Sequence, residues 1–275
     1  QYAELWEACK AAMHQQLPAD SVIGVAPHSL RAVSRECFKD YAAVSKNGPF
    51  HMHLAEQIAE VEEVKQSYGQ RPVEWVLDHL EIRSGSCFVH CTQMLPHETS
   101  NLARTPAVVG LCPITESSLG DGIFDGVNWL SQGGKIAIGS DSNIRISLPE
   151  EMRTLEYTQR LRDHSRAALA TPCKSPGRRI FDEVCQGGAL AAGRNTGCIA
   201  CGKLGDLLAL DSRAIDLDSR VKDSILDSFA FAGDHRMITD VWSAGRHQVR
   251  GGRHVDRDRI VTKYRRVMHE LRDVF

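Results

Sequence analysis

The chain has 275 residues, a formal net charge of −2 at pH 7 and 42% hydrophobic residues, the composition of an ordinary globular protein. This near-neutral balance gives no electrostatic basis for binding nucleic acid or an anionic membrane, and no apolar run approaches the roughly 18 residues that span a bilayer. The nine cysteines are an odd number, which favours reduced thiols in a cytoplasmic protein.

The first 195 residues repeat one unit, in which a short β-branched run ends near a polar residue and a helical pattern follows. An amphipathic helix is predicted before the first unit, over residues 1–16. The predicted strands then end at His28, His53, His90, Pro113 and Asp141. Strands that alternate with helices predict an α/β fold with a parallel sheet.

Four of these five strand ends carry an ionisable side chain. In a (β/α)8 barrel of the TIM type, active sites lie at the C-terminal ends of the strands, so this pattern favours such a barrel. Five strands do not close an eight-stranded barrel. We therefore predict the C-terminal part of a barrel whose three first strands precede residue 1, with an open sheet as the alternative.

After residue 195 the sequence changes to short strand-like segments separated by Gly and Asp turn signals. We predict a partial barrel over residues 1–195 that carries the catalytic residues, and a small β-rich subdomain over 196–275. The subdomain ends in a charged helix from about Val255 to Phe275, and we interpret its charges as a solvent-exposed helix face. Cys198 and Cys201 form the only C-x-x-C pair, and a loop with two small buried residues is favoured over a zinc site.

The stretch HMHLAEQ, residues 51–57, places His51 and His53 on one face of a strand. The two histidines could form a metal pair, or His53 could act with Glu56, three residues later. A metal that activates water needs imidazole and carboxylate ligands and a nearby general acid/base. His53 and Asp141 offer such ligands, and Glu56 and His90 could reach a water on the metal.

These motifs resemble the amidohydrolase superfamily, whose deaminase branch has His-x-x-Glu, a later strand-end His and a final Ser-Asp in that order. The closer similarity is to the formimidoylglutamate deiminases of histidine degradation. It covers essentially the whole chain, and the stretches that carry it include APHSLRAV, HMHLAEQ, VHCTQM, TESSLGDGIF and GSDSN. The combination of APHSLRAV with TESSLGDGIF is specific.

The resemblance implies that His53 and Asp141 are metal ligands, that Glu56 is the proton shuttle and that His90 is a catalytic histidine. The expected cofactor is one divalent metal ion, with zinc favoured by the imidazole and carboxylate set and iron or manganese as alternatives.

The resemblance also implies that His28 and Arg31 hold the carboxylates of the substrate. A guanidinium suits this role because it grips a carboxylate through two hydrogen bonds and stays charged when dehydrated. The implied reaction is the hydrolysis of N-formimino-L-glutamate to N-formyl-L-glutamate and ammonia. We expect a small-molecule substrate as the partner, and a homodimer.

One feature departs from the family, whose paired His-x-His ligands lie on the first barrel strand. Nothing before His28 matches that pair, so we expect it upstream of the chain and interpret His51 as a strand residue facing the barrel interior. Two alternatives stay open. The chain could belong to another superfamily deaminase that acts on a purine, pyrimidine or related C=N substrate, or it could be an inactive fragment without the first two ligands.

Overall fold

A computed structural model describes residues 2–38, 41, 48–143, 145–272 and 274. It contains two four-stranded sheets. The first is parallel and follows chain order: β1 Phe50–Leu54, β2 Ser86–His90, β3 Val108–Leu111 and β4 Lys135–Ile138. The second, which we call the small sheet because its last strand has only two residues, is antiparallel: β5 Leu207–Leu210, β6 Ile238–Ser243, β7 Arg246–Arg250 and β8 Arg253–His254. The predicted α/β fold, a parallel sheet followed by a small β-rich part, is confirmed. The boundary at residue 195 stays a prediction.

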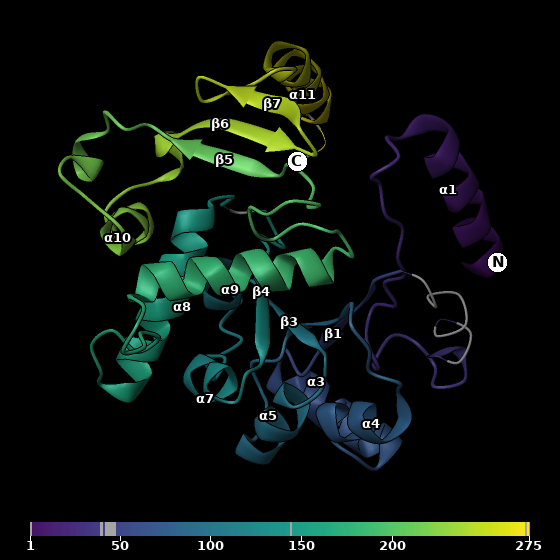
Figure 1. The fold of residues 1–275 in the computed structure, drawn as a ribbon. Helices are drawn as coiled ribbons and strands as arrows, with labels where there is room; N and C mark the ends of the chain where they lie inside the picture. The colour runs from purple at the N-terminus through teal and green to yellow at the C-terminus, as the bar shows by residue number, and fades with distance from the viewer. Residues whose placement is uncertain (1, 39–40, 42–47, 144, 273, 275) are drawn as a thin grey trace.

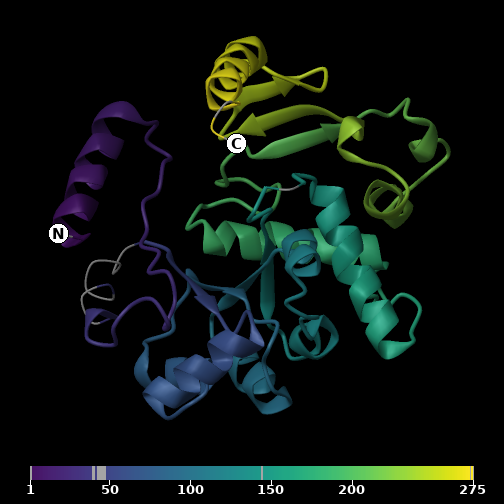
Figure 2. The ribbon, with the colours of Figure 1, turned by 180° about the vertical axis from the view of Figure 1, so that it is seen from behind.

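Helices connect the parallel strands: α3 Ile58–Tyr68 and α4 Pro72–His79 follow β1, α5 Pro96–Ala103 follows β2, α6 Pro113–Leu119 and α7 Gly126–Ser131 follow β3, and α8 Leu148–Asp163 and α9 Pro176–Ala191 follow β4. The described residues also form α1 Tyr2–Gln16, α10 Asp223–Phe231, α11 Arg257–Leu271 and the 3-10 turns η1 Ile215–Leu217 and η2 His235–Met237. Figures 1 and 2 show α1 at one side and α11 beside the small sheet. Within the described segments, no helix combines the length and apolar character needed to cross a membrane.

The two faces of β1 differ, as the alternation of a strand requires. Phe50, Met52 and Leu54 are buried in the main hydrophobic core, which also contains apolar side chains of α3, α4, α5 and α7. His51 and His53 lie on the opposite face and are only partly buried. There the Nε2 atom of His51 lies 2.7 Å from the carbonyl oxygen of Ala191, at the end of α9.

The strand predicted to end at His28 is reduced to an isolated bridge between Val25 and Phe50. The segment still runs parallel to β1, because the backbone N–H groups of His51 and His53 donate to the carbonyls of Val25 and His28. Pro27 has no backbone N–H to donate, which limits regular pairing here. The strands β3 and β4 end at Leu111 and Ile138, earlier than predicted.

Helix α9 lies directly against β4 (Figure 1). The close approach depends on Gly187, because a β-carbon there would overlap the carbonyl group of Ile136. At the next residue, Gly188, an added β-carbon would meet no described atom within 4 Å apart from its chain neighbours and the backbone of α9 itself. Gly187 therefore has no room for a β-carbon, whereas the neighbouring Gly188 has room for one.

We predict that Gly187→Ala lowers the free energy of unfolding by about 1–3 kcal/mol, because α9 must move away from β4. The control Gly188→Ala should leave stability unchanged or raise it by up to about 1 kcal/mol, since alanine favours the helix. Urea unfolding of both variants measures the difference. Equal stabilities would show that α9 adapts to the extra carbon.

Candidate metal centre and active site

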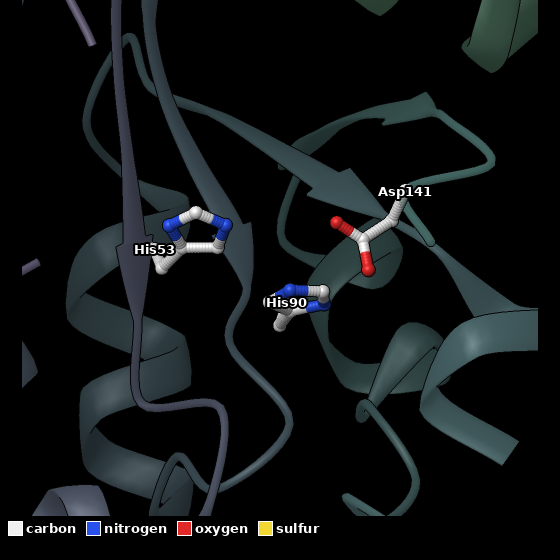
Figure 3. A group of neighbouring side chains, drawn as sticks. All are labelled: His53, His90 and Asp141. Carbon is white, nitrogen blue, oxygen red and sulfur yellow. The ribbon is translucent and has the colours of Figure 1, made fainter. Parts of the chain in front are cut away.

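The ends of the parallel strands bring together His53 of β1, His90 at the end of β2 and Asp141 in the turn after β4. Each residue offers one ligand atom, and these three atoms lie within 4.8 Å of one another. The imidazole rings of His53 and His90 are stacked, with centroids 5.6 Å apart and planes inclined by 21°. Figure 3 shows the three side chains converging. The arrangement is compact enough for a single metal ion and the groups that act around it.

The position of His90 depends on a turn of the backbone. His90 is paired with Leu54 in the register of β1 and β2, and Leu54 is buried in the core on the helix-covered face. Strand alternation alone would send His90 to that face. Instead the backbone takes left-handed angles, with φ 73° at His90 and φ 53° at Cys91. This turn leaves the His90 ring stacked on His53, and such backbone strain is typical of functional sites.

Both ring nitrogens of His90 face carboxylates. Nδ1 lies 3.2 Å from Oε1 of Glu116, and Nε2 lies 3.7 Å from Oε1 of Glu56. Burial alone lowers the pKa of His90, but the hydrogen bond to Glu116 and the charges of Glu116, Glu56 and Asp141 outweigh it and raise the pKa. The surroundings of His90 therefore favour a charged imidazolium that can donate protons.

The ring of His53 has one nitrogen free for a metal. Its Nδ1 lies 2.8 Å from the carbonyl oxygen of His28, and a carbonyl can only accept a hydrogen bond. Nδ1 therefore carries the proton, and Nε2 presents its lone pair. Metal-binding histidines are usually oriented in this way by a partner on the other nitrogen. The His28 ring lies beside that of His53, at a centroid distance of 4.9 Å.

The loop that carries Glu56 is held from two directions. The buried carboxylate of Glu60 accepts hydrogen bonds from the backbone N–H groups of Ala55 (3.2 Å) and Glu56 (2.7 Å). The hydroxyl of Thr92 donates to the carbonyl of Glu56 at 2.5 Å. Burial raises the pKa of Glu60, and its backbone hydrogen bonds oppose that rise. The sequence prediction missed Glu60 and Glu116, whose only local signal is an acidic residue in a first helical turn.

Arg31 lies on the surface, with its side chain 43% exposed and Nη1 3.6 Å from Oε2 of Glu63 on α3. His28 is also exposed, and its Nδ1 lies 2.9 Å from the hydroxyl of Ser29. Both side chains are therefore exposed, and the backbone carbonyl of His28 accepts the N–H of His53 in β1. Their predicted role in holding substrate carboxylates stays a prediction.

The Cys198 and Cys201 pair lies in the loop between α9 and β5, as expected, but both residues are exposed rather than buried. The predicted burial is wrong because this connection runs over the surface, as most loops do.

A second grouping of possible metal ligands, Glu74, His97 and Glu98, is occupied by protein contacts. The guanidinium of Arg71 binds both carboxylate oxygens of Glu98, at 3.0 and 3.1 Å. The Nε2 atom of His97 lies 3.1 Å from Oε1 of Glu74. These residues are therefore best explained as links between α4 and α5.

A buried carboxyl of α8 binds the first turn of α6. Glu151 is 2% exposed, and its Oε2 accepts the backbone N–H of Ile114 at 2.9 Å. Within the described segments, its Oε1 has no hydrogen-bond partner. Burial raises the pKa of Glu151 from 4.5 to about 7, with smaller contributions from the charges of Glu116 and Glu150.

This pKa shift predicts a stability change with pH. A carboxyl whose pKa is raised by folding stabilises the protein fully below its unfolded pKa, and that contribution is lost as pH rises through the folded value. Glu151→Gln keeps an acceptor for Ile114 and does not titrate. The variant should therefore gain about 3 kcal/mol relative to the original protein between pH 4 and pH 8.

Chemical unfolding of both proteins at several pH values measures this gain. Glu150→Gln is the matched control, because Arg145 lowers the pKa of Glu150 and the pH trend should have the opposite sign. Parallel stability curves for Glu151→Gln and the original protein would contradict the prediction.

The chain is similar in sequence to a known family and to several characterised proteins. The family model described as "Amidohydrolase family" matches residues 1–247. A formimidoylglutamate deiminase from Pseudomonas aeruginosa is 39% identical over 274 residues, which are 99% of this chain and 60% of that protein. A 5'-deoxyadenosine deaminase from Methanothermobacter thermautotrophicus is 30% identical over 218 residues, covering 77% of this chain and 50% of that protein.

Solved structures of similar fold also match nearly the whole chain. A crystal structure of an amidohydrolase from Brucella melitensis superposes with a TM-score of 0.91 at 39% identity, covering 98% of this chain and 59% of that one. An adenosine deaminase from Xanthomonas campestris with bound zinc has a TM-score of 0.84 at 24% identity, covering 97% and 62%, and supports the fold alone. The chain thus spans about half to three fifths of the length of these relatives.

Proposed function

Because the chain belongs to the amidohydrolase family, we propose that it carries the catalytic residues of a metal-dependent enzyme that hydrolyses N-formimino-L-glutamate to N-formyl-L-glutamate and ammonia. The observation that carries this proposal is the convergence of His53, His90 and Asp141, with the carboxylate of Glu56 3.7 Å from His90. The 39% identity to a formimidoylglutamate deiminase supports the choice of substrate.

The side chains fit a divalent metal ion. Nε2 of His53 and the carboxylate of Asp141 would hold it, and imidazole with carboxylate is a donor set that suits zinc, with iron or manganese as alternatives. A metal ion bound there would supply a water that ionises near neutral pH. We assign His90 a catalytic role rather than a ligand role, because both of its nitrogens already face carboxylates.

Glu56 would transfer the protons of the reaction, and His90 would orient the water. The oxygen of water forms a bond to the formimino carbon, and the bond from that carbon to the terminal nitrogen breaks. The oxygen becomes the formyl oxygen, and the two hydrogens of the water leave on ammonia. Glu56 takes a proton from the water and delivers it to the departing nitrogen, which must leave as a neutral amine. His90, whose Nε2 lies 3.7 Å from the Glu56 carboxylate, would orient the same water.

His28 and Arg31 would bind the carboxylates of the glutamate part of the substrate. Both side chains are exposed, His28 lies beside His53 of β1, and the guanidinium of Arg31 already pairs with a carboxylate, that of Glu63. A deaminase that acts on a purine or pyrimidine ring would have no evident need for Arg31 and His28 as carboxylate-binding residues. This distinguishes the proposal from the nucleoside deaminases that share the metal residues.

The proposal includes four further features that follow from the sequence. The enzyme works as a cytoplasmic homodimer on a small-molecule substrate. Residues 1–195 form the barrel part and residues 196–275 the small subdomain. The nine free cysteines support the cytoplasmic location, and the separate small sheet that begins at β5 supports the division of the chain.

The central test is Glu56→Gln in the full-length protein. Glutamine keeps the shape of the side chain without its titratable proton, so zinc content should be unchanged while turnover falls by about a hundred- to ten-thousand-fold. Ammonia release is measured with N-formimino-L-glutamate and with 5'-deoxyadenosine as substrates. The control is Glu62→Gln on the exposed face of α3, which should leave turnover unchanged.

Three outcomes would contradict the proposal. Loss of zinc from Glu56→Gln would make Glu56 a ligand rather than a proton carrier. Turnover of the nucleoside by the original protein, without turnover of N-formimino-L-glutamate, would assign the site to the alternative class of deaminase. An original protein that binds zinc weakly and substoichiometrically would instead favour the non-catalytic alternative.

Arg31→Met tests the choice of substrate. Methionine keeps much of the bulk and removes the guanidinium, so a substrate carboxylate would be bound without its partner. Breaking such a charged pair costs about 2–5 kcal/mol, or roughly thirty- to several-thousand-fold in kcat/KM. Zinc content should not change. The measurement is kcat/KM from steady-state kinetics with N-formimino-L-glutamate.

The matched control for this experiment is Glu63→Gln, which removes the ion pair of Arg31 and keeps the guanidinium. Its kcat/KM should stay within about threefold of the original value, because an exposed ion pair contributes about 0–1 kcal/mol. Equal losses in Arg31→Met and Glu63→Gln, or a loss below about threefold in Arg31→Met, would show that Arg31 does not hold the substrate.

A further inference from the structure

The hydroxyl of Thr115 binds the chain on both sides of Asp141. Thr115 lies in the first turn of α6 and is fully buried. Its Oγ1 donates to the carbonyl of Ser140 at 3.0 Å and accepts the backbone N–H of Ser142 at 3.3 Å. The Oγ atom of Ser142 lies 2.9 Å from the same oxygen. One donated and two accepted hydrogen bonds satisfy a hydroxyl completely.

Asp141 needs such support because regular structure ends before it. Strand β4 stops at Ile138, and Asp141 is exposed with a left-handed backbone, φ 49°. Only glycine, and to a lesser degree asparagine and aspartate, adopts this conformation readily. A metal ligand must nevertheless be held within about 0.5 Å of its working position. The strand therefore does not by itself fix the carboxylate.

Thr115 and its neighbour Glu116 act on different parts of the site from one helical turn. Oε1 of Glu116 accepts the backbone N–H of Cys112 at 2.8 Å and faces Nδ1 of His90 at 3.2 Å. Thr115 reaches the turn after β4, and Glu116 reaches the end of β2. The first turn of α6 thus connects two strand ends that are not neighbours in the sheet order β1-β2-β3-β4.

We propose that Thr115 is a positioning residue of the metal centre, whose hydroxyl fixes the turn 140–142 and with it the carboxylate of Asp141. The inference rests on the proposed role of Asp141 as a metal ligand. It adds to that role a residue that touches neither metal nor substrate. Loss of the hydroxyl should weaken metal binding more than it weakens the fold.

The experiment measures the affinity of the full-length, metal-stripped protein for zinc, by competition with a chromophoric chelator. Thr115→Val removes the hydroxyl and keeps the size and branching of the side chain. Loss of such an outer partner typically weakens metal binding 10- to 100-fold, and we expect a loss in that range. Thr115→Ser keeps the hydroxyl and should restore the affinity to within about threefold of the original.

The control variant is Ser117→Ala, two residues along the same helix. The hydroxyl of Ser117 donates to the carbonyl of Pro113 at 2.7 Å and does not contact the turn that carries Asp141. Its removal should leave zinc affinity unchanged. Thermal unfolding of the metal-free variants separates the two roles, because a purely structural Thr115 would lower the melting temperature without changing zinc affinity.

A zinc affinity of Thr115→Val within about threefold of the original would overturn the inference, whatever its melting temperature. Asp141→Asn distinguishes this failure from failure of the proposed function: unchanged zinc affinity in Asp141→Asn would refute the metal role of Asp141 itself. Should Thr115→Val not fold, Ser142→Ala removes one of the same contacts from the exposed side of the turn. Weaker zinc binding by Ser142→Ala supports the inference, and unchanged binding overturns it.

Discussion

The parallel register of β1 to β4 is the constraint on which the candidate site depends. In a parallel sheet every strand ends at the same edge, so His53, His90 and Asp141 come within 4.8 Å although they are far apart in the sequence. The pairing continues past the end of β4, because the backbone N–H of Gly139 donates to the carbonyl of Leu111 at 2.9 Å. An antiparallel arrangement would have sent alternate strand ends to opposite edges.

Register alone does not complete the site, because strand alternation would turn His90 toward the core and leave Asp141 unsupported. The backbone departs from strand geometry at both residues, and each left-handed residue costs about 1–2 kcal/mol. Buried polar side chains in the first turn of α6 hold these turns: Glu116 faces His90, and Thr115 binds the turn that carries Asp141. The strained conformations are thus stabilised by hydrogen bonds from outside the strands.

Much of the fold follows from local sequence signals. Short β-branched runs and amphipathic patterns predicted the strands β1 to β4 and the helices between them, since periodicity reports directly which face of an element is buried. The segment ending at His28 carries the same signals but forms a bridge, because Pro27 limits the backbone pairing that a strand needs. The supporting roles of Glu60, Thr115 and Glu116 could not be predicted. Their partners are brought close by the tertiary fold, and in the sequence they look like ordinary residues near the start of a helix.

The arrangement separates the groups for chemistry from the groups proposed to choose the substrate. His53 and His90 belong to the sheet and are held by hydrogen bonds, whereas Arg31 lies on an exposed segment and pairs with Glu63. An ion pair with side chains 43% and 55% exposed is worth about 0–1 kcal/mol, so Arg31 loses little when it leaves Glu63. A substrate carboxylate that is shielded from water would bind the same guanidinium more strongly, because the attraction between charges grows as the surroundings become less polar. The exchange of one carboxylate for another would then favour the bound substrate while the metal centre remains unchanged.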